Sequence, residues 1–260
     1  MVKVLVLLKL VPDVVEEPEI AADGRSLDPS SVRLVVSERD EHALEEALLL
    51  KERYGGTVTA VALDVPEVDD VLFTALAKGA DRAVKVSGVE PGMSTWAAAA
   101  ALARTLRVTP GLLPADLILT GVQAIDDLDG QTGPVVARLL ELPYVSMVSR
   151  VEVDPAGHEA VVAREYAGGV TGTFEVRLPV VLGVQSAEKP PRYVPVARVR
   201  AAMKAQRLEV LPAAVEEEPA HLEVLQLSKP QVGGGAVMLE GSPEEVAAQI
   251  CDLLRERGLV

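Results

Sequence analysis

The chain has 260 residues, 49% of them hydrophobic, and a mean hydropathy of +0.25, a composition that excludes a disordered protein. Lys and Arg number 25 against 39 Asp and Glu, so the formal net charge is −14, and only 3% of the residues are aromatic. An acidic surface repels a phosphate backbone, and too few rings are present to stack on bases, so we expect no binding to nucleic acid.

The single cysteine, Cys251, can form no internal disulfide, which is typical of a reducing cytoplasm. His42, His158 and His221 are scattered without the spacing of metal ligands. The apolar run at the start is too short for a signal peptide, and no run approaches the ~20 apolar residues of a membrane helix. We therefore expect a soluble, cytoplasmic chain that does not insert into a membrane.

Through residue 140, short runs rich in Val and Leu alternate with longer segments of helical periodicity. Strands are predicted at 3–10, 57–63, 82–86 and 117–120, and helices at 38–54, 66–78, 94–106 and 132–140. Ser37 and Asp40 have the spacing of a capping box for the first helix. Strands that alternate with helices of this length indicate βαβ units around a parallel sheet.

After residue 143 the pattern changes to an antiparallel run at 144–153, 159–166 and 171–178, followed by a buried strand at 180–184. The fold class is therefore α/β, an open and mostly parallel sheet with helices on both faces and some antiparallel strands, over residues 1–185. Residues 186–211 are predicted to form a loop and a short helix. Residues 212–260, with a linker at 212–219 and a helix capped by Ser242, are predicted to form an extended arm with little core of its own.

The most informative segment is G-V-Q-A-I-D-D-L-D-G-Q-T-G at residues 121–133. It leaves the carboxyl end of a predicted parallel strand and enters a helix, and ligands of open α/β sheets bind at that edge. The start of a helix offers free N–H groups to an anion. Thr132 can add a hydroxyl, and Gly130 and Gly133 allow close approach. We infer a site for a phosphate.

The carboxylates of Asp126, Asp127 and Asp129 would repel a phosphate unless they accept hydrogen bonds from ribose hydroxyls or an adenine amino group. The alternative is a solvated acidic loop in which Thr132 is only the N-cap. Ser37 with Asp40 is a weaker candidate, for which an ordinary capping box is the simpler explanation. Lys9 with Asp13 is a third pair, which could contact a phosphate and a sugar or form a plain Pro-Asp turn.

Between residues 189 and 207 the chain has cationic residues and no acid, against the negative charge elsewhere. Such an island favours a docking surface for an acidic partner, with apolar anchors such as Val196 and Met203. The alternative is a solvated loop and helix face. No Walker A, G-x-G-x-x-G or G-x-S-x-G motif is present, and no nucleophile-base pair follows from spacing. We therefore expect a binding or carrier role without catalytic residues.

Several segments together resemble the β subunit of electron-transfer flavoproteins. They are K-L-V-P-D at 9–13, A-L-E-E-A at 43–47, T-A-L-A-K-G-A-D at 74–81, the segment at 121–133, P-R-Y at 191–193 and M-K-A at 203–205. The resemblance covers most of the chain. It implies an adenine nucleotide α-hydrolase-like fold, a heterodimer with an α subunit that holds most of the FAD, and AMP as a structural ligand of this chain.

The resemblance further implies that dehydrogenases such as acyl-CoA dehydrogenases dock here, that electrons pass through FAD to a quinone oxidoreductase, and that residues 212–260 wrap the α subunit. The implied nucleotide contacts are Leu7, Lys9, Ser37, Asp40, Leu63, Asp64, Gly121, Val122, Gln123, Ala124, Ile125, Asp126, Asp127, Asp129, Gly130, Gln131 and Thr132. The implied or inferred docking residues are Arg192, Tyr193, Val196, Arg198, Arg200, Met203 and Lys204.

Two alternatives stay open. In some relatives a second FAD replaces AMP and the protein bifurcates electrons, but these tend to have a D-G-D-T-A-Q loop, whereas D-D-L-D-G-Q-T at 126–132 favours AMP. The other is a stand-alone adenine-nucleotide sensor of the universal-stress type. The chain also departs from the family at residues 37–40, where S-E-R-D replaces N-P-[FY]-[DC], so the family supports Ser37 as a contact only weakly.

Overall fold

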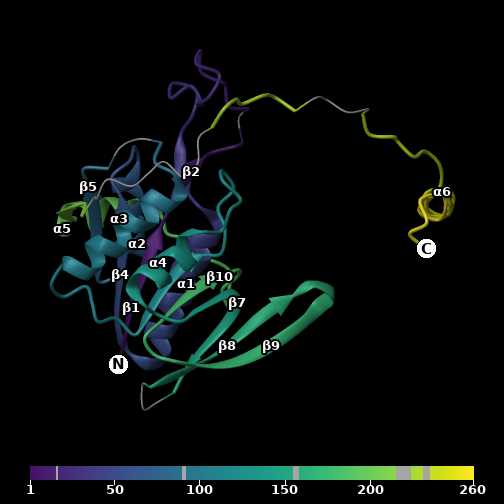
Figure 1. Cartoon of the computed structure of the whole chain (residues 1–260). Helices are drawn as coiled ribbons and strands as arrows, with labels where there is room; N and C mark the ends of the chain where they lie inside the picture. The colour runs from purple at the N-terminus through teal and green to yellow at the C-terminus, as the bar shows by residue number, and fades with distance from the viewer. Residues whose placement is uncertain (16, 90–91, 155–157, 215–223, 231–234) are drawn as a thin grey trace. The chain divides into compact units, whose positions relative to one another are not determined.

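The computed structural model describes residues 1–15, 17–89, 92–154, 158–214, 224–230 and 235–260 (Figure 1). The chain divides into two compact units, residues 1–225 and 226–260, which are treated separately. The predicted linker at 212–219 lies mostly outside the described residues. The docking role of 186–211 and the arm at 212–260 stay predictions. No helix in the described part of the chain has the length and apolarity to cross a membrane.

The first unit is built on a mostly parallel sheet, as predicted. Buried strands such as β1 (Val2–Leu8) and β6 (Leu117–Gly121) are apolar on both faces because helices cover both. The antiparallel pairs of this sheet are β7–β8 and β8–β9. Strand β7, predicted within an antiparallel run, is antiparallel to β8 but parallel to β10. Across the sheet the order is β11 (Glu209–Pro212), β5 (Arg82–Ser87), β4 (Gly56–Leu63), β1 (Val2–Leu8), β6 (Leu117–Gly121), β10 (Val180–Val184), β7 (Tyr144–Val153), β8 (Glu159–Tyr166) and β9 (Val170–Arg177).

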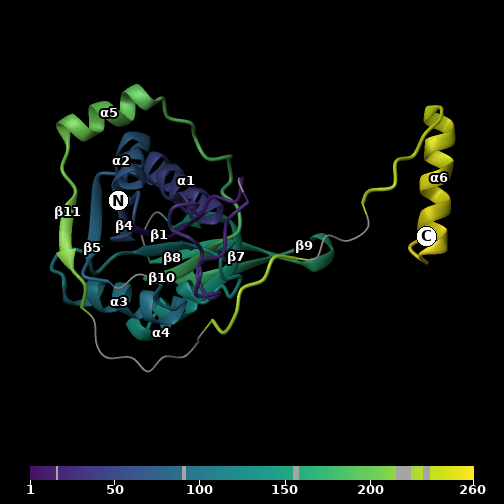
Figure 2. The same ribbon diagram turned by 90° about the horizontal axis from the view of Figure 1, so that it is seen from above.

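Helices cover both faces of the sheet (Figure 2). Helices α1 (Glu38–Tyr54) and α2 (Val68–Lys78) pack on the side chains of Val4 and Val6, while α3 (Thr95–Val108) and α4 (Thr132–Leu140) pack on Leu5 and Leu7. Helix α5 (Val196–Ala205) lies beside α2, on the α1/α2 face. In the second unit, α6 (Pro243–Glu256) begins with the predicted capping box of Ser242 and Glu245. The predicted layers are therefore confirmed.

Three short strands were not predicted as separate elements. The chain leaves the sheet at Lys9, and β2 (Leu10–Pro12) pairs with β3 (Leu34–Val36) in a small antiparallel sheet. The main-chain groups of Lys9 explain the break, because its N–H donates to Asp40 and its carbonyl accepts from the N–H of Ser37. Strand β11 follows α5 and adds parallel to β5, where the sequence predicts only a loop.

Ile118 is fully buried at the centre of β6, on the α3/α4 face. We expect Ile118→Ala to lower the free energy of unfolding by about 2–5 kcal/mol, because the surrounding core collapses only partly onto the cavity. Val108→Ala, at an exposed position of α3, is the control and should cost less than about 0.5 kcal/mol. Urea unfolding measures both, and equal losses would contradict the assigned core.

Candidate functional site

The candidate site lies where β1, β4 and β6 end. These strands are parallel neighbours, so their carboxyl ends meet at one edge of the sheet. Lys9 follows β1, Leu63 and Asp64 close β4, and the loop before α4 follows β6. The structure thus brings Lys9, Asp40 and the segment at 121–132 together, as the sequence predicts for adjacent strand ends.

Asp40, in the first turn of α1, fastens two of these strand ends to each other. Its buried carboxylate accepts hydrogen bonds from the N–H of Lys9, at 2.9 Å, and from the N–H of Gly121. A Cβ on Gly121 would lie 2.7 Å from Asp40 Oδ1, so only glycine allows this approach. The predicted capping box is wrong, because Ser37 makes no side-chain cap and the strand ends occupy the carboxylate that would complete it.

Burial governs the titration of Asp40. It raises the pKa of this carboxyl to about 7, against the lowering effect of the two N–H donors and of Lys9. A buried carboxylate is costly even when it is hydrogen-bonded, because desolvation disfavours its charged form. The edge of the sheet is therefore held by a group that titrates near neutral pH.

The ammonium group of Lys9 binds the loop after β6. Its Nζ lies 2.7 Å from Asp126 Oδ1 and also contacts Asp127, whose carboxylate accepts a 2.8 Å hydrogen bond from the Thr95 hydroxyl at the start of α3. Burial alone would lower the pKa of Lys9, but the two aspartates outweigh it and raise the pKa. Lys9 is thus charged, and it compensates part of the negative charge of this loop.

The rest of the loop is ordered by its own carboxylates. Asp127 accepts the N–H of Asp129 at 3.2 Å, and Asp129 accepts the N–H of Gln131 at 3.0 Å. Helix α4 begins at Thr132, so Thr132 is not its N-cap; Gln131 has that position and makes no side-chain cap. The first turn of α4 contains no acidic residue. Its N–H groups are therefore suited to an anion.

An unpaired hydroxyl lies beneath this first turn. Thr120 Oγ1, in a side chain that is 1% exposed, has no hydrogen-bond partner among the described residues. A Cβ on Gly133, in the first turn of α4, would lie 3.0 Å from that oxygen and 2.7 Å from the Tyr144 ring. Glycine at position 133 therefore lets α4 pack directly on the Tyr144 ring and Thr120, and this packing leaves the buried hydroxyl without a partner.

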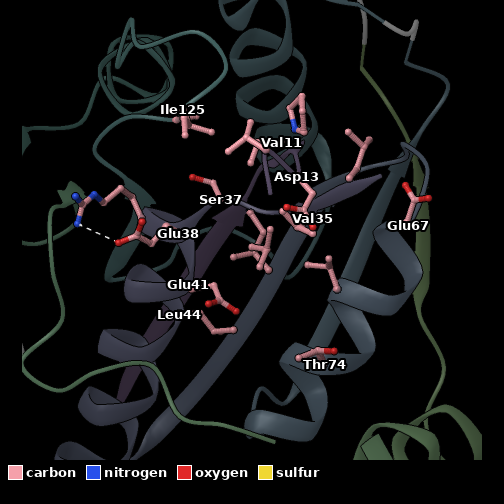
Figure 3. Close-up of a pocket in the computed structure, with 18 of the residues that line it drawn as sticks. Val11, Asp13, Val35, Ser37, Glu38, Glu41, Leu44, Glu67, Thr74 and Ile125 are labelled. Atoms are coloured by element: carbon pink, nitrogen blue, oxygen red, sulfur yellow. Dashed lines mark ion pairs between the residues drawn. The ribbon is translucent and has the colours of Figure 1, made fainter. Parts of the chain in front are cut away.

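The predicted contacts divide between the two faces of the sheet. Leu7 and Leu63 pack in the core of the α3/α4 face. Ser37 and residues 123–125 instead line a cavity of about 830 Å³ on the α1/α2 face, which Figure 3 shows with Ser37 and Ile125 at its wall. Asp64 belongs to neither group and forms a 3.5 Å ion pair with Lys85. The structure therefore does not bring all the predicted contacts together.

Sequence reasoning missed this cavity. Its apolar lining comes from residues such as Leu44, Val71 and Leu34, which belong to α1, α2 and β3. Acidic side chains, among them Glu38, Glu41 and Glu67, stand around it in Figure 3. No motif marks it, because the cavity exists only once the β2–β3 pair lies over the two helices.

The predicted docking residues gather on and before α5. Tyr193, at 84% exposure, Val196, Arg198, Arg200 and Lys204 are exposed, and Met203 is half-buried. The guanidinium of Arg192 instead turns onto α1, where it meets Glu45 and Glu52. The exposed members form a face that is both cationic and apolar.

Comparisons with known proteins agree on one family. The family model described as "Electron transfer flavoprotein domain" matches residues 26–218. An "Electron transfer flavoprotein subunit beta" of Methylophilus methylotrophus is 31% identical, over 98% of both chains, and that of Bacillus subtilis is 30% identical, over 94% of this chain and 95% of its own. A "Caffeyl-CoA reductase-Etf complex subunit CarD" of Acetobacterium woodii is 29% identical, over 99% of this chain and all of its own.

The raised pKa of Asp40 predicts a pH dependence of stability. Below pH 4 the carboxyl is protonated in both the folded and unfolded chain. Between pH 4 and 7 only the folded chain keeps the proton, so the free energy of unfolding falls as the pH rises. Asp40→Asn removes this titration. The free energy of unfolding of the unaltered protein, minus that of Asp40→Asn, should therefore fall by a few kcal/mol between pH 4 and 7.

Urea unfolding across this pH range measures the effect. Asp252→Asn, at an exposed position of α6, is the control, and its stability should follow that of the unaltered protein at every pH. A constant difference between Asp40→Asn and the unaltered protein would show that Asp40 is ionised throughout.

Proposed function

This chain belongs to the β subunits of electron transfer flavoproteins, and on that premise we propose that it binds AMP at the α3/α4 side of its sheet edge. A β subunit implies an α subunit and a flavin in the complex, and the role of the pair is electron transfer. We further propose that most of the FAD is held by the α subunit, that this chain has no catalytic residue, and that AMP serves architecture.

The observation that carries the AMP proposal is the start of α4. The first turn of α4 has no side-chain cap and no acidic residue, so its free N–H groups fit a phosphate. The N–H groups of Gly130, Thr132 and Gly133 and the Thr132 hydroxyl would hold the phosphate, while the N–H of Gln131 stays with Asp129. Leu63, which is only partly buried, would supply apolar surface for a base on this face.

The acidic loop does not oppose this proposal. Lys9 offsets part of the charge of Asp126 and Asp127, and Asp129 is engaged with the main chain of Gln131. We propose that Asp40 acts on the nucleotide by holding Lys9 and Gly121 in place. Ser37 and residues 123–125 line the other cavity, so direct contact with the same nucleotide is less favoured for them.

The alternative is a second FAD in place of AMP, as in electron-bifurcating relatives. The relative named as a subunit of a caffeyl-CoA reductase complex keeps this alternative open. The loop D-D-L-D-G-Q-T at 126–132 favours AMP. The match of the family model argues against a stand-alone stress-type sensor.

Counting the small molecules released from the purified heterodimer tests the proposal. We expect one FAD and one AMP per heterodimer. Two flavins without AMP would support the alternative, and an absence of any adenosine monophosphate or second flavin would contradict a nucleotide site in this chain.

Thr132→Ala should reduce the AMP content of the purified heterodimer severalfold, because a hydrogen bond to a charged group contributes about 1.5–3 kcal/mol. Flavin reduction should remain possible. Thr74→Ala is the matched control, since Thr74 lines the cavity on the opposite face. Mass analysis of released nucleotide is the readout. Loss of AMP from Thr74→Ala but not from Thr132→Ala would move the nucleotide to that cavity.

We also propose that the exposed face of α5 docks dehydrogenases, acyl-CoA dehydrogenases among them, and that a quinone oxidoreductase receives the electrons. The support is that Arg198, Arg200 and Lys204 are exposed on α5, as are Val196 on the same helix and Tyr193 before it, in a chain with a net charge of −14. Cations around an apolar anchor are typical of a surface that attracts and orients an acidic partner.

Arg198→Glu with Arg200→Glu should slow electron uptake from a dehydrogenase about tenfold or more at low salt and weaken its salt dependence. Arg107→Glu with Arg138→Glu makes the same charge change at exposed positions of α3 and α4. Stopped-flow reduction of the heterodimer measures both pairs. Equal slowing by the two pairs would indicate net charge alone and contradict docking at α5.

A further inference from the structure

We propose that the ion pair of Arg192 with Glu45 is a positioning clamp that sets the docking helix α5, and that Arg192 makes no contact with the docked partner. The inference rests on the proposed docking role of α5. The sequence groups Arg192 with the docking cations, whereas the structure separates it from them.

The clamp is nearly saturated with hydrogen bonds. Glu45, on α1, is 3% exposed, and its carboxylate accepts the Arg192 Nη2 at 2.8 Å, the Nε at 2.9 Å and the main-chain N–H at 2.9 Å. Arg192 Nη1 donates to Glu52, two helical turns further along α1, at 2.6 Å. Such a bidentate fork fixes both the position and the orientation of the residue.

The chain before Arg192 is held to the same helix. Glu46, also buried, accepts the N–H of Val151 at 3.2 Å and of Glu188 at 3.0 Å. His42 Nδ1 accepts the N–H of Ala187 at 3.1 Å, and Arg39 donates to the carbonyl of Gln185 at 2.9 Å. Residues 185–192 therefore follow α1 closely, and the Arg192 pair is the last of these contacts before α5.

Helix α5 begins four residues after Arg192, and its far end is fixed as well. Pro195 precedes its first residue, and β11 pairs with β5 soon after its last. Val199 packs against the core of the α1/α2 face. Fixing both ends presents the exposed face of α5 in one orientation, which lowers the entropic cost of docking.

The experiment compares Glu45→Gln with Arg192→Ala in the intact heterodimer. Glu45 is too buried to touch a partner. If Arg192 contacts the partner directly, Glu45→Gln should leave KM unchanged, whereas the clamp predicts that it raises KM. We expect both variants to raise the KM for heterodimer in dehydrogenase-coupled turnover about tenfold, at unchanged kcat and FAD content. Together the two changes should raise KM no more than either alone. Glu52→Gln, at the exposed end of the clamp, should change KM less than about twofold.

A second variant and a second readout keep the test decisive. Arg192→Lys keeps the charge but loses the bidentate fork, so it should raise KM nearly as much as Arg192→Ala. Amide hydrogen exchange in residues 193–205 should become faster in each clamp variant. An unchanged KM for Glu45→Gln would overturn the clamp. If Glu45→Gln does not assemble into a heterodimer, an unchanged KM for Arg192→Lys would overturn it instead. If Arg198→Glu with Arg200→Glu also leaves electron uptake unchanged, it is the docking proposal that fails.

Discussion

The buried carboxylates of α1 are the interaction on which the rest of this structure depends. Asp40 accepts two main-chain N–H groups from the ends of β1 and β6, and Glu45 and Glu46 accept three more from β7 and from the segment before α5. A carboxylate removed from water is costly unless such donors replace the water. Each of these residues therefore holds the chain that surrounds it in one arrangement.

One helix consequently serves two regions that are far apart in the sequence. At its start, α1 fixes the strand ends from which Lys9 and the loop at 121–132 emerge. Along its length, it fixes the segment that leads to α5. The sheet separates the proposed nucleotide face, under α3 and α4, from the face with the cavity and the docking helix (Figure 2). In this arrangement the proposed AMP would stabilise the edge of the sheet, and the proposed docking would take place on a helix set by other contacts.

Periodic and apolar patterns sufficed to predict most of the fold. The strands at 144–153, 159–166 and 180–184 have the predicted bounds, because each is a β-branched run between clear turn signals. Strands β3 and β11 were missed because three or four residues carry no periodicity of their own. The edge of the sheet was predicted as the site because parallel topology alone places three strand ends there.

The details of the site depended on contacts that no local pattern contains. Ser37 and Asp40 have the spacing of a capping box, but the Asp40 carboxylate instead accepts hydrogen bonds from the N–H groups of Lys9 and Gly121. Arg192 lies in a cationic run, but the acidic residues that neutralise it are on α1, far earlier in the chain. Charge patterns show which residues are cationic and not which of them remain exposed.

The most direct test of the central claim is the electron density of the crystallised heterodimer at the start of α4. The account predicts a nucleoside monophosphate with its phosphate at the N–H groups of Gly130, Thr132 and Gly133 and its base on the α3/α4 face. Density for only water or side chains there, or for a nucleotide in the cavity beside α2, would contradict it.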